Sequence, residues 1–164
     1  MHLATPAGVS IREARPEDCE ALLALYCDVH DRHLAAQPHE FDPLTPEEEA
    51  QLMRQFARTD TDSSQVYVAE DERGLIGCVR FDVRTVNRSR KAQRTYLYIN
   101  MLVVALKWQD RGIGAMLLER VHAFARAAHV DEIALDVYEF NRAGRRLYER
   151  MGYQTVTRRM KLRL

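Results

Sequence analysis

The spacing of apolar residues in the first third of the chain predicts a short strand followed by two helices. Residues 9–14 are expected to form a short strand. Pro16 then begins a segment in which apolar residues recur every three or four positions, the spacing of one helix face. A second helix is expected from Thr45, because Thr45 and Glu48 can form a capping box and Pro46 suits the first helical position.

Three strands are expected next, at Gln65 to Glu70, at Val79 to Arg84 and at Thr95 to Ala105. The second of them alternates apolar and charged residues, which is typical of a strand with one face toward solvent. A basic hairpin loop, Asn87 to Lys91, separates it from the third. The third ends in Met101 to Val104, which is apolar on both faces and therefore predicts a central strand covered on both sides.

The last third of the chain predicts helix, strand, helix and strand. A helix is expected from Gly112 to Ala128, and a strand follows from Ile133 to Val137. A shorter helix starts at Asn141 and ends at Gly152, where glycine suits a left-handed stop. Residues Thr155 to Leu164 alternate again and predict a final strand. The order of elements implies an α/β fold in which helices cover both faces of a mixed sheet.

Length, charge and cysteine content limit the kinds of function that need considering. The chain has 164 residues, which suits a single domain spanning residues 1–164. Its 24 basic and 24 acidic side chains cancel, so a protein devoted to binding nucleic acid is not expected. No apolar run approaches the ~18 residues of a membrane helix, and residues 1–6 lack the features of a secretory signal. Three cysteines without a CxxC pair predict reduced thiols and a cytoplasmic location.

A glycine-bearing turn, Gln109 to Gly114, joins the apolar strand to the next helix. The first turn of a helix leaves about four backbone N–H groups without partners and carries partial positive charge, so it binds anions. Glycines let a bulky phosphate approach the backbone, and a diphosphate is therefore the expected ligand. The chain has no GxxxxGK[ST] run of a Walker loop, and Leu117 stands where a dinucleotide fingerprint needs its third glycine.

Two motifs in this part of the chain resemble those of the GNAT superfamily of N-acetyltransferases. The family's turn, [Gln/Arg]-x-x-Gly-x-[Gly/Ala], is matched by Gln109, Gly112 and Gly114. Its segment Asn-x-x-Ala-x-x-Leu-Tyr-x-x-x-Gly-[Phe/Tyr] is similar to residues 141–153, with Gly144 where the family usually has Ala. The resemblance implies a central, mostly antiparallel sheet of about seven strands flanked by about four helices. It also implies that the chain binds acetyl-CoA.

The resemblance further implies which residues hold acetyl-CoA. In the family, the strand before the turn separates from its neighbour, and its backbone bonds the pantetheine arm of coenzyme A. The diphosphate lies on the turn, and a Tyr on the last helix protonates the leaving thiolate. The corresponding cofactor-binding residues here are Leu102, Val103, Val104, Gln109, Asp110, Arg111, Gly112, Ile113, Gly114, Ala115, Asn141 and Tyr148, with Tyr148 as the catalytic proton donor.

The acceptor side departs from the family's pattern at Asn100. Many members carry an acidic residue at this position on the central strand, and an Asn side chain cannot take a proton from the attacking amine. Water or another residue must then take the proton, or the substrate must arrive largely neutral. Among the side chains, Glu139, Tyr98 and His30 are the candidates. The resemblance implies that the acceptor lies over the first two helices and the sheet edge. The corresponding acceptor-lining residues are His30, His33, Phe41, Tyr98 and Asn100. The three histidines between positions 30 and 39 favour a solvated loop over a metal site.

Together these features predict an acetyl-CoA-dependent N-acetyltransferase, an acyltransferase in which a primary amine attacks the thioester directly. The expected acceptor is a small amine or an amino-acid-like molecule, and the sequence does not specify which. Two alternatives stay open. The acceptor could be a protein N-terminus or lysine, or the chain could be an acyl-CoA-binding sensor without turnover, which Asn100 would suit. A homodimer is also expected, because the alternating segment Thr155 to Leu164 offers a strand edge to a second copy.

Overall fold

The computed structural model describes residues 6, 8–57, 64–88 and 91–162, and the side chains of all of these except residues 86–88 and 91–94. Residues 1–5, which belong to the segment compared above with a secretory signal, lie outside this description. Within it, the elements follow the predicted order as far as the last helix. They are β1 (Ser10–Glu13), the 3₁₀ helix η1 (Pro16–Asp18), α1 (Cys19–Ala36), α2 (Pro46–Ala57), β2 (Ser64–Asp71), β3 (Gly74–Arg88), β4 (Lys91–Val104), the 3₁₀ helix η2 (Leu106–Trp108), α3 (Ile113–Ala127), β5 (Ile133–Leu135) and α4 (Arg142–Arg150).

The sheet formed by the described residues has five strands, in the order β1-β2-β3-β4-β5. Neighbouring strands are antiparallel except for β4 and β5, which are parallel. The α/β class and the mixed, mostly antiparallel sheet are therefore confirmed. The expected number of about seven strands was too high, chiefly because the C-terminal segment adds no strand to this sheet.

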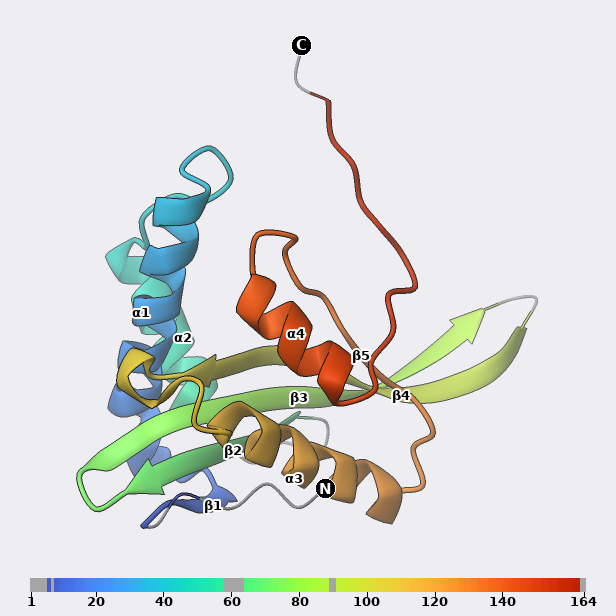
Figure 1. Cartoon of the computed structure of the whole chain (residues 1–164), viewed down its shortest axis with the longest axis horizontal. Coiled ribbons are helices and arrows are strands. Elements are labelled where there is room, and N and C mark those ends of the chain that lie inside the picture. The colour runs from blue at the N-terminus through green and yellow to red at the C-terminus, as the bar shows by residue number, and fades with distance from the viewer. Residues whose placement is uncertain (1–5, 7, 58–63, 89–90, 163–164) are drawn as a thin grey trace.

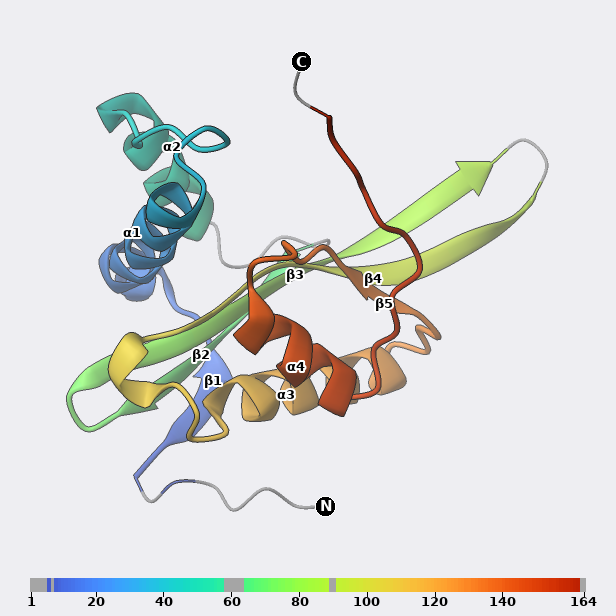
Figure 2. The same ribbon diagram turned by 45° about the horizontal axis from the view of Figure 1, so that its top comes forward.

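The prediction of a final strand from Thr155 to Leu164 was wrong for its described part, which ends at Leu162. This segment has no regular structure and leaves the body of the molecule as an extended tail (Figures 1 and 2). Alternation alone does not make a strand, because backbone groups need a neighbouring strand to bond, and the sheet of the described residues ends at β5. The apolar side chains of the tail are consequently exposed, by 94% at Val156, 86% at Met160 and 85% at Leu162. Leu164 lies outside the described residues.

Two other predicted boundaries differ from the structure. β5 ends at Leu135, and Val137 is an exposed residue of the following loop, so the predicted strand was too long. In the other direction, β3 reaches Arg88 and β4 begins at Lys91, which makes the hairpin longer than predicted. Residues 89 and 90 of the expected basic loop lie outside the described residues.

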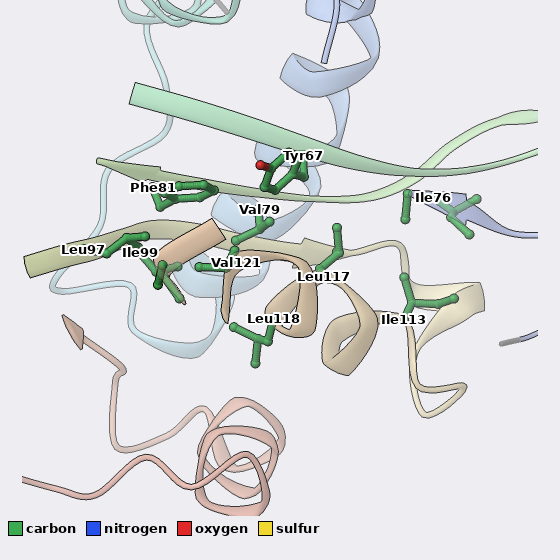
Figure 3. Close-up of a cluster of buried hydrophobic side chains, with 12 residues drawn as sticks. Tyr67, Ile76, Val79, Phe81, Leu97, Ile99, Ile113, Leu117, Leu118 and Val121 are labelled. Atoms are coloured by element: carbon green, nitrogen blue, oxygen red, sulfur yellow. The ribbon is translucent and has the colours of Figure 1, made fainter. Parts of the chain in front are cut away.

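The helices cover the two faces of the sheet (Figure 1). α1 and α2 pack on one face around a buried cluster that includes Leu22, Phe56 and Cys78. α3 packs on the other face, and α4 lies beside it (Figures 1 and 2). The cluster beneath α3 is the larger one (Figure 3), and its buried members are Tyr67, Ala69, Ile76, Val79, Phe81, Leu97, Ile99, Ile113, Leu117, Leu118, Val121 and Ala125.

A β-bulge at Asn100 reverses the alternation of side chains along β4. Asn100 is left without a partner on β3, since Ile99 and Met101 pair there with two adjacent residues. Ile99 faces the cluster beneath α3, whereas Met101 and Val103 face the cluster beneath α1 and α2. Leu102 returns to the α3 side. The segment predicted to be covered on both faces is therefore confirmed as such, with the bulge at its start.

Candidate active site

The pairing between β4 and β5 ends midway along β4, and this produces a fork in the sheet. The last paired residues are Ile99 and Leu135. β4 continues to Val104 with β3 on one side. Among the described residues, no strand pairs with its other side beyond Ile99. Leu102, Val103 and Val104 therefore line the open edge of the fork, and α4 lies in front of it (Figure 2).

The turn after β4 has the geometry of an anion site. Asp110 and Gly112 both have positive φ, at 58° and 84°, and α3 begins at Ile113 directly after them. Turns of this kind direct successive backbone N–H groups toward one concave side. The N–H groups of the first helical turn add to them, because helix geometry gives them no partner within the helix. The predicted sequence of buried strand, glycine turn and helix is thus confirmed, and Arg111 is exposed beside it.

The two glycines of the turn have different roles. Gly112 supplies the left-handed conformation, and a Cβ placed on it would meet nothing within 4 Å. Gly114 is instead a packing residue, because a Cβ there would lie 2.8 Å from Cδ2 of Leu147 on α4. The expectation that both glycines give room to a phosphate therefore fits Gly112, while Gly114 gives room to a neighbouring helix.

Gln109 contacts the strand before the turn. Its side-chain Nε2 donates a hydrogen bond to the backbone carbonyl of Val104, at 3.0 Å. This bond ties the end of β4 to the turn and so fixes how the backbone passes from one to the other. The side chain of Gln109 thus holds the turn in shape, and its role in binding the cofactor stays a prediction.

α4 is placed by its first residue and by its packing against α3. The side chain of Asn141 caps the helix, since its Oδ1 accepts a hydrogen bond from the N–H of Gly144 at 2.9 Å. A Cβ at Gly144 would lie 2.8 Å from Nδ2 of Asn141, so a glycine fits closely against the cap. Leu147 packs on Gly114, and Tyr148 follows it on the side of the cluster beneath α3.

Tyr148 is half-buried, and burial raises the pKa of its hydroxyl to about 12. Its ring meets that of Tyr153 edge-on, with 5.8 Å between the centroids. The hydroxyl of Tyr153 has a hydrogen-bond partner within the protein, since it lies 2.9 Å from Nε2 of His122 on α3. A tyrosine with a raised pKa keeps its proton at neutral pH, and Tyr148 is therefore in the state that a proton donor needs.

On the other side of the fork, polar side chains of β3, β4 and the residue after β5 meet on one face of the sheet. Nη2 of Arg84 donates to Oδ1 of Asn100 at 2.8 Å and to Asp82 at 3.3 Å. The same guanidinium lies over the ring of Tyr98, 3.8 Å from its centroid. The hydroxyl of Tyr98 donates to Oδ2 of Asp136 at 2.8 Å. The structure thus brings together Tyr98 and Asn100, two of the predicted acceptor-lining residues.

The other predicted acceptor-lining residues form an aromatic cluster at the end of α1. The ring centroid of His33 lies close to those of three aromatic side chains. The distances are 5.3 Å to Phe41, 5.6 Å to Tyr138 and 5.4 Å to Phe140. Burial lowers the pKa of His33, so its ring is neutral at neutral pH. His30 meets Phe41 edge-on and has its Nε2 2.8 Å from the carbonyl of Asp42. No group of three potential ligands in the described part of the chain could hold a metal ion.

Sequence reasoning missed three residues of this region. Tyr138 and Phe140 belong to the aromatic cluster, and Asp136 belongs to the polar group at the fork. A signal existed for Asp136, because an acidic residue directly after a parallel strand often lies at a functional edge of a sheet. Glu139, one of the predicted proton acceptors, forms an ion pair of 2.6 Å with Arg145.

The family model for GNAT acetyltransferases matches residues 29–153. The chain belongs to the GNAT family of acetyltransferases. The fork, the glycine turn and the capped helix all lie within the matched residues. No functionally curated protein matches it. None of the helices in the described residues is long and apolar enough to cross a membrane.

Solved structures of other proteins share the GNAT fold of this chain. A mutant of the BH1408 protein from Bacillus halodurans is similar at 29% identity with a TM-score of 0.86, over 94% of this chain and 99% of that one. An acetyltransferase from Trypanosoma brucei is similar at 20% identity and a TM-score of 0.65, over 95% and 99% of the two chains. The aminoglycoside N-acetyltransferase AAC(6')-Iy in complex with CoA is similar at 13% identity and a TM-score of 0.70, over 99% of each chain. At their identities, the last two show the fold alone.

Proposed function

We propose that this GNAT protein is an acetyl-CoA-dependent N-acetyltransferase whose acceptor is a small primary amine. The observation that carries the proposal is the position of the fork beside the N-terminus of α3. The open edge of β4 at Leu102 to Val104 leads directly into a turn whose N–H groups suit a diphosphate. The open space above Gly112 leaves that turn accessible to a bulky ligand.

The residues of this chain would divide the binding of acetyl-CoA between them. The turn and the first turn of α3, Asp110 to Ala115, would hold the diphosphate with their N–H groups and the partial charge of the helix. The backbone of Leu102 to Val104 would bond the pantetheine arm as an added strand. When bound there, acetyl-CoA supplies an acetyl group activated as a thioester.

Tyr148 would complete the transfer at the sulfur. The amine nitrogen bonds to the carbonyl carbon, the carbon–sulfur bond breaks, and the nitrogen loses one proton. Because its pKa of about 12 keeps it protonated, Tyr148 can give a proton to the departing sulfur and regain one from water. A backbone N–H of β4 near Leu102 would polarise the carbonyl during the attack.

The aromatic cluster favours a small acceptor that carries apolar or ring structure next to its amine. His33, Phe41, Tyr138 and Phe140 join the end of α1 to the loop before α4 and so border the acceptor side of the fork. The exposed fraction of Tyr138, 51%, leaves part of its ring open to a ligand. A peptide amine and a sensor without turnover are the competing functions, and the experiments below separate them.

Acetyl-CoA should raise the melting temperature of the protein. A ligand at about 100 times its Kd stabilises the native state by about 2.7 kcal/mol, and a protein of this size gains about 2–4 °C per kcal/mol. Differential scanning fluorimetry should therefore record a rise of about 5–10 °C with acetyl-CoA or CoA. ATP and NAD, which lack the pantetheine arm, are the matched ligands and should leave the melting temperature unchanged. The absence of a shift with both CoA forms would contradict the cofactor assignment.

A thiol-release assay against a panel of amines then identifies the class of acceptor. The panel contains neamine, amino acids, and peptides that offer a free N-terminus or a lysine. Turnover with the small amines supports the proposal, whereas turnover with the peptides alone supports a protein acetyltransferase. A melting shift with acetyl-CoA but no thiol release with any member of the panel supports the sensor.

We also propose that two copies associate through the C-terminal tail. The tail alternates exposed apolar residues, Val156, Met160 and Leu162, with polar ones, and β5 is the last strand of the described sheet. The tail of one copy could therefore add to the free edge of β5 in the other, which would bury these side chains. Lys161 contacts Glu40 of the same chain, so the tail passes near the loop between α1 and α2.

Removal of the tail after Tyr153 should convert the dimer to a monomer. Light scattering after size-exclusion chromatography would measure the mass of the full chain and of the shortened one. The double variant Met160→Glu and Leu162→Glu keeps the full length and tests whether the apolar side chains are responsible. A full-length monomer, or a dimer that survives both changes, would exclude the tail as the contact.

A further inference from the structure

The fork places an acidic side chain next to the position where the family usually has one. β4 and β5 are parallel and their last paired residues are Ile99 and Leu135, so the next residue on each strand is Asn100 and Asp136. These two residues flank the point where the strands separate. An acid directly after the neighbouring strand thus stands beside the bulge of β4 that carries the amide.

Tyr98 fixes the Asp136 carboxylate on the open face of the sheet. The hydroxyl of Tyr98 donates to Oδ2 of Asp136 at 2.8 Å. Burial and the carboxylate of Asp136 raise the pKa of Tyr98, so this hydroxyl keeps its proton and stays the donor of the bond. An ionised carboxylate offers about four acceptor positions, and the bond to Tyr98 uses one of them. Asp136 is exposed, so a ligand can reach the other positions.

Asn100 presents the opposite kind of group. Its Oδ1 accepts the hydrogen bond from Nη2 of Arg84, which directs its amide NH₂ away from the guanidinium. The bond to Arg84 uses one acceptor position of Oδ1, and a neutral amide does not take a proton from an amine. Arg84 is held in turn by Asp82 and by the ring of Tyr98. The other two acids of this region are both in ion pairs, Asp82 with Arg84 and Glu139 with Arg145. Asp136 is therefore the side chain of this group that can receive a proton.

We propose that Asp136 binds the amine of the acceptor and takes its proton, with Tyr98 as the residue that positions the carboxylate. The inference rests on the proposed function and assigns the step that Asn100 leaves open. The acceptor first releases its ammonium proton to water and attacks as the neutral amine. As the nitrogen then bonds to the carbonyl carbon it becomes far more acidic, and one N–H bond breaks toward an oxygen of Asp136. The carbon–sulfur bond breaks in the same reaction, and the sulfur receives its proton from Tyr148. One proton thus leaves the nitrogen and one reaches the sulfur.

The test compares Asp136→Asn with Glu139→Gln, a matched change of an acid three residues away in the same loop. Asp136→Asn should lower kcat with the best panel amine by about 10²-fold or more and leave the acetyl-CoA melting shift intact. Glu139→Gln should keep the wild-type kcat. Tyr98→Phe should cause a smaller loss, and the double variant should be no slower than Asp136→Asn alone, because the two residues act through one carboxylate. Wild-type kcat in Asp136→Asn, or equal losses in both single acid variants, would overturn the proposal.

A binding experiment without acetyl-CoA tests the same site separately. The carboxyl carbon of Asp136, followed by NMR at neutral pH, should shift when ethylamine is added, and ethanol, its neutral analogue, should leave it in place. No shift with ethylamine would overturn the assignment of Asp136 as the amine site. If acetyl-CoA itself fails to raise the melting temperature of the wild type, the proposed function fails, while this titration still decides about Asp136.

Discussion

Replacing Tyr148 by Phe should lower kcat by about 10²–10⁴-fold, the usual contribution of a positioned acid or base. The ring remains, so its edge-on contact with Tyr153 and its packing against the cluster beneath α3 should persist. Only the proton donor is lost, and the thiolate must then leave without one. The affinity for acetyl-CoA, measured by calorimetry, should stay near the wild-type value. An unchanged kcat would remove Tyr148 from the mechanism.

Tyr153→Phe is the matched control for this experiment. Burial raises the pKa of both tyrosines, and the two rings touch, so the variants differ mainly in which hydroxyl is removed. The hydroxyl of Tyr153 bonds His122 within the protein, and its loss should affect stability more than turnover.

The raised pKa of Tyr148 also predicts how its proton-donor form depends on pH. Since Tyr148 is protonated below a pKa of about 12, its donor form persists through neutral and moderately alkaline pH.

Gly114→Val should disturb both stability and turnover, because it forces α3 and α4 apart. A Cβ at Gly114 already lies 2.8 Å from Cδ2 of Leu147, and the two further methyl groups of Val enlarge the clash. Overpacking of this kind costs about 1–3 kcal/mol, which thermal unfolding would record as a fall of about 2–4 °C per kcal/mol. Because Leu147 precedes Tyr148, the shift of α4 should also displace the proton donor and lower kcat strongly.

A second change in the same contact gives the control. Leu147→Ala removes the side chain that a larger residue at position 114 would meet. The double variant should be more stable than the sum of the two single losses predicts, since residues in contact are not additive. Gly112→Ala, by contrast, strains a left-handed residue without touching α4. A Gly114→Val variant with wild-type melting temperature and kcat would show that the contact is easily relieved.

Local signals in the sequence were sufficient to predict where the helices begin and end. The capping box of Thr45 and Glu48 forms as predicted, with hydrogen bonds of 2.8 and 3.2 Å. Asn141 caps α4, and Gly152 after it has a φ of 92°, the left-handed stop expected of it. Each of these features depends on residues a few positions apart, which is why the amino-acid pattern alone predicts them.

The strands show the limit of such reasoning, because their partners are distant in the sequence. Alternation predicted a final strand from Thr155, but alternation describes side chains and does not supply a neighbouring strand. The fork between β4 and β5 also depends on where pairing stops, and nothing in the sequence of β5 marks Leu135 as its last paired residue. Asp136 was therefore missed, although Asn100 was correctly recognised as a position where an acid was absent.

The bulge at Asn100 lets β4 carry one residue more than its partner strand without exchanging its two faces. Before it, odd-numbered residues such as Ile99 face α3, and after it, odd-numbered residues such as Val103 face α1 and α2. If Asn100 instead took a regular paired place in the strand, the two layers would be exchanged for the rest of β4. The apolar side chains would remain apolar, yet the backbone groups at the fork would point to the wrong sides. The bulge thus decides which face of the sheet each residue of β4 takes beyond the fork.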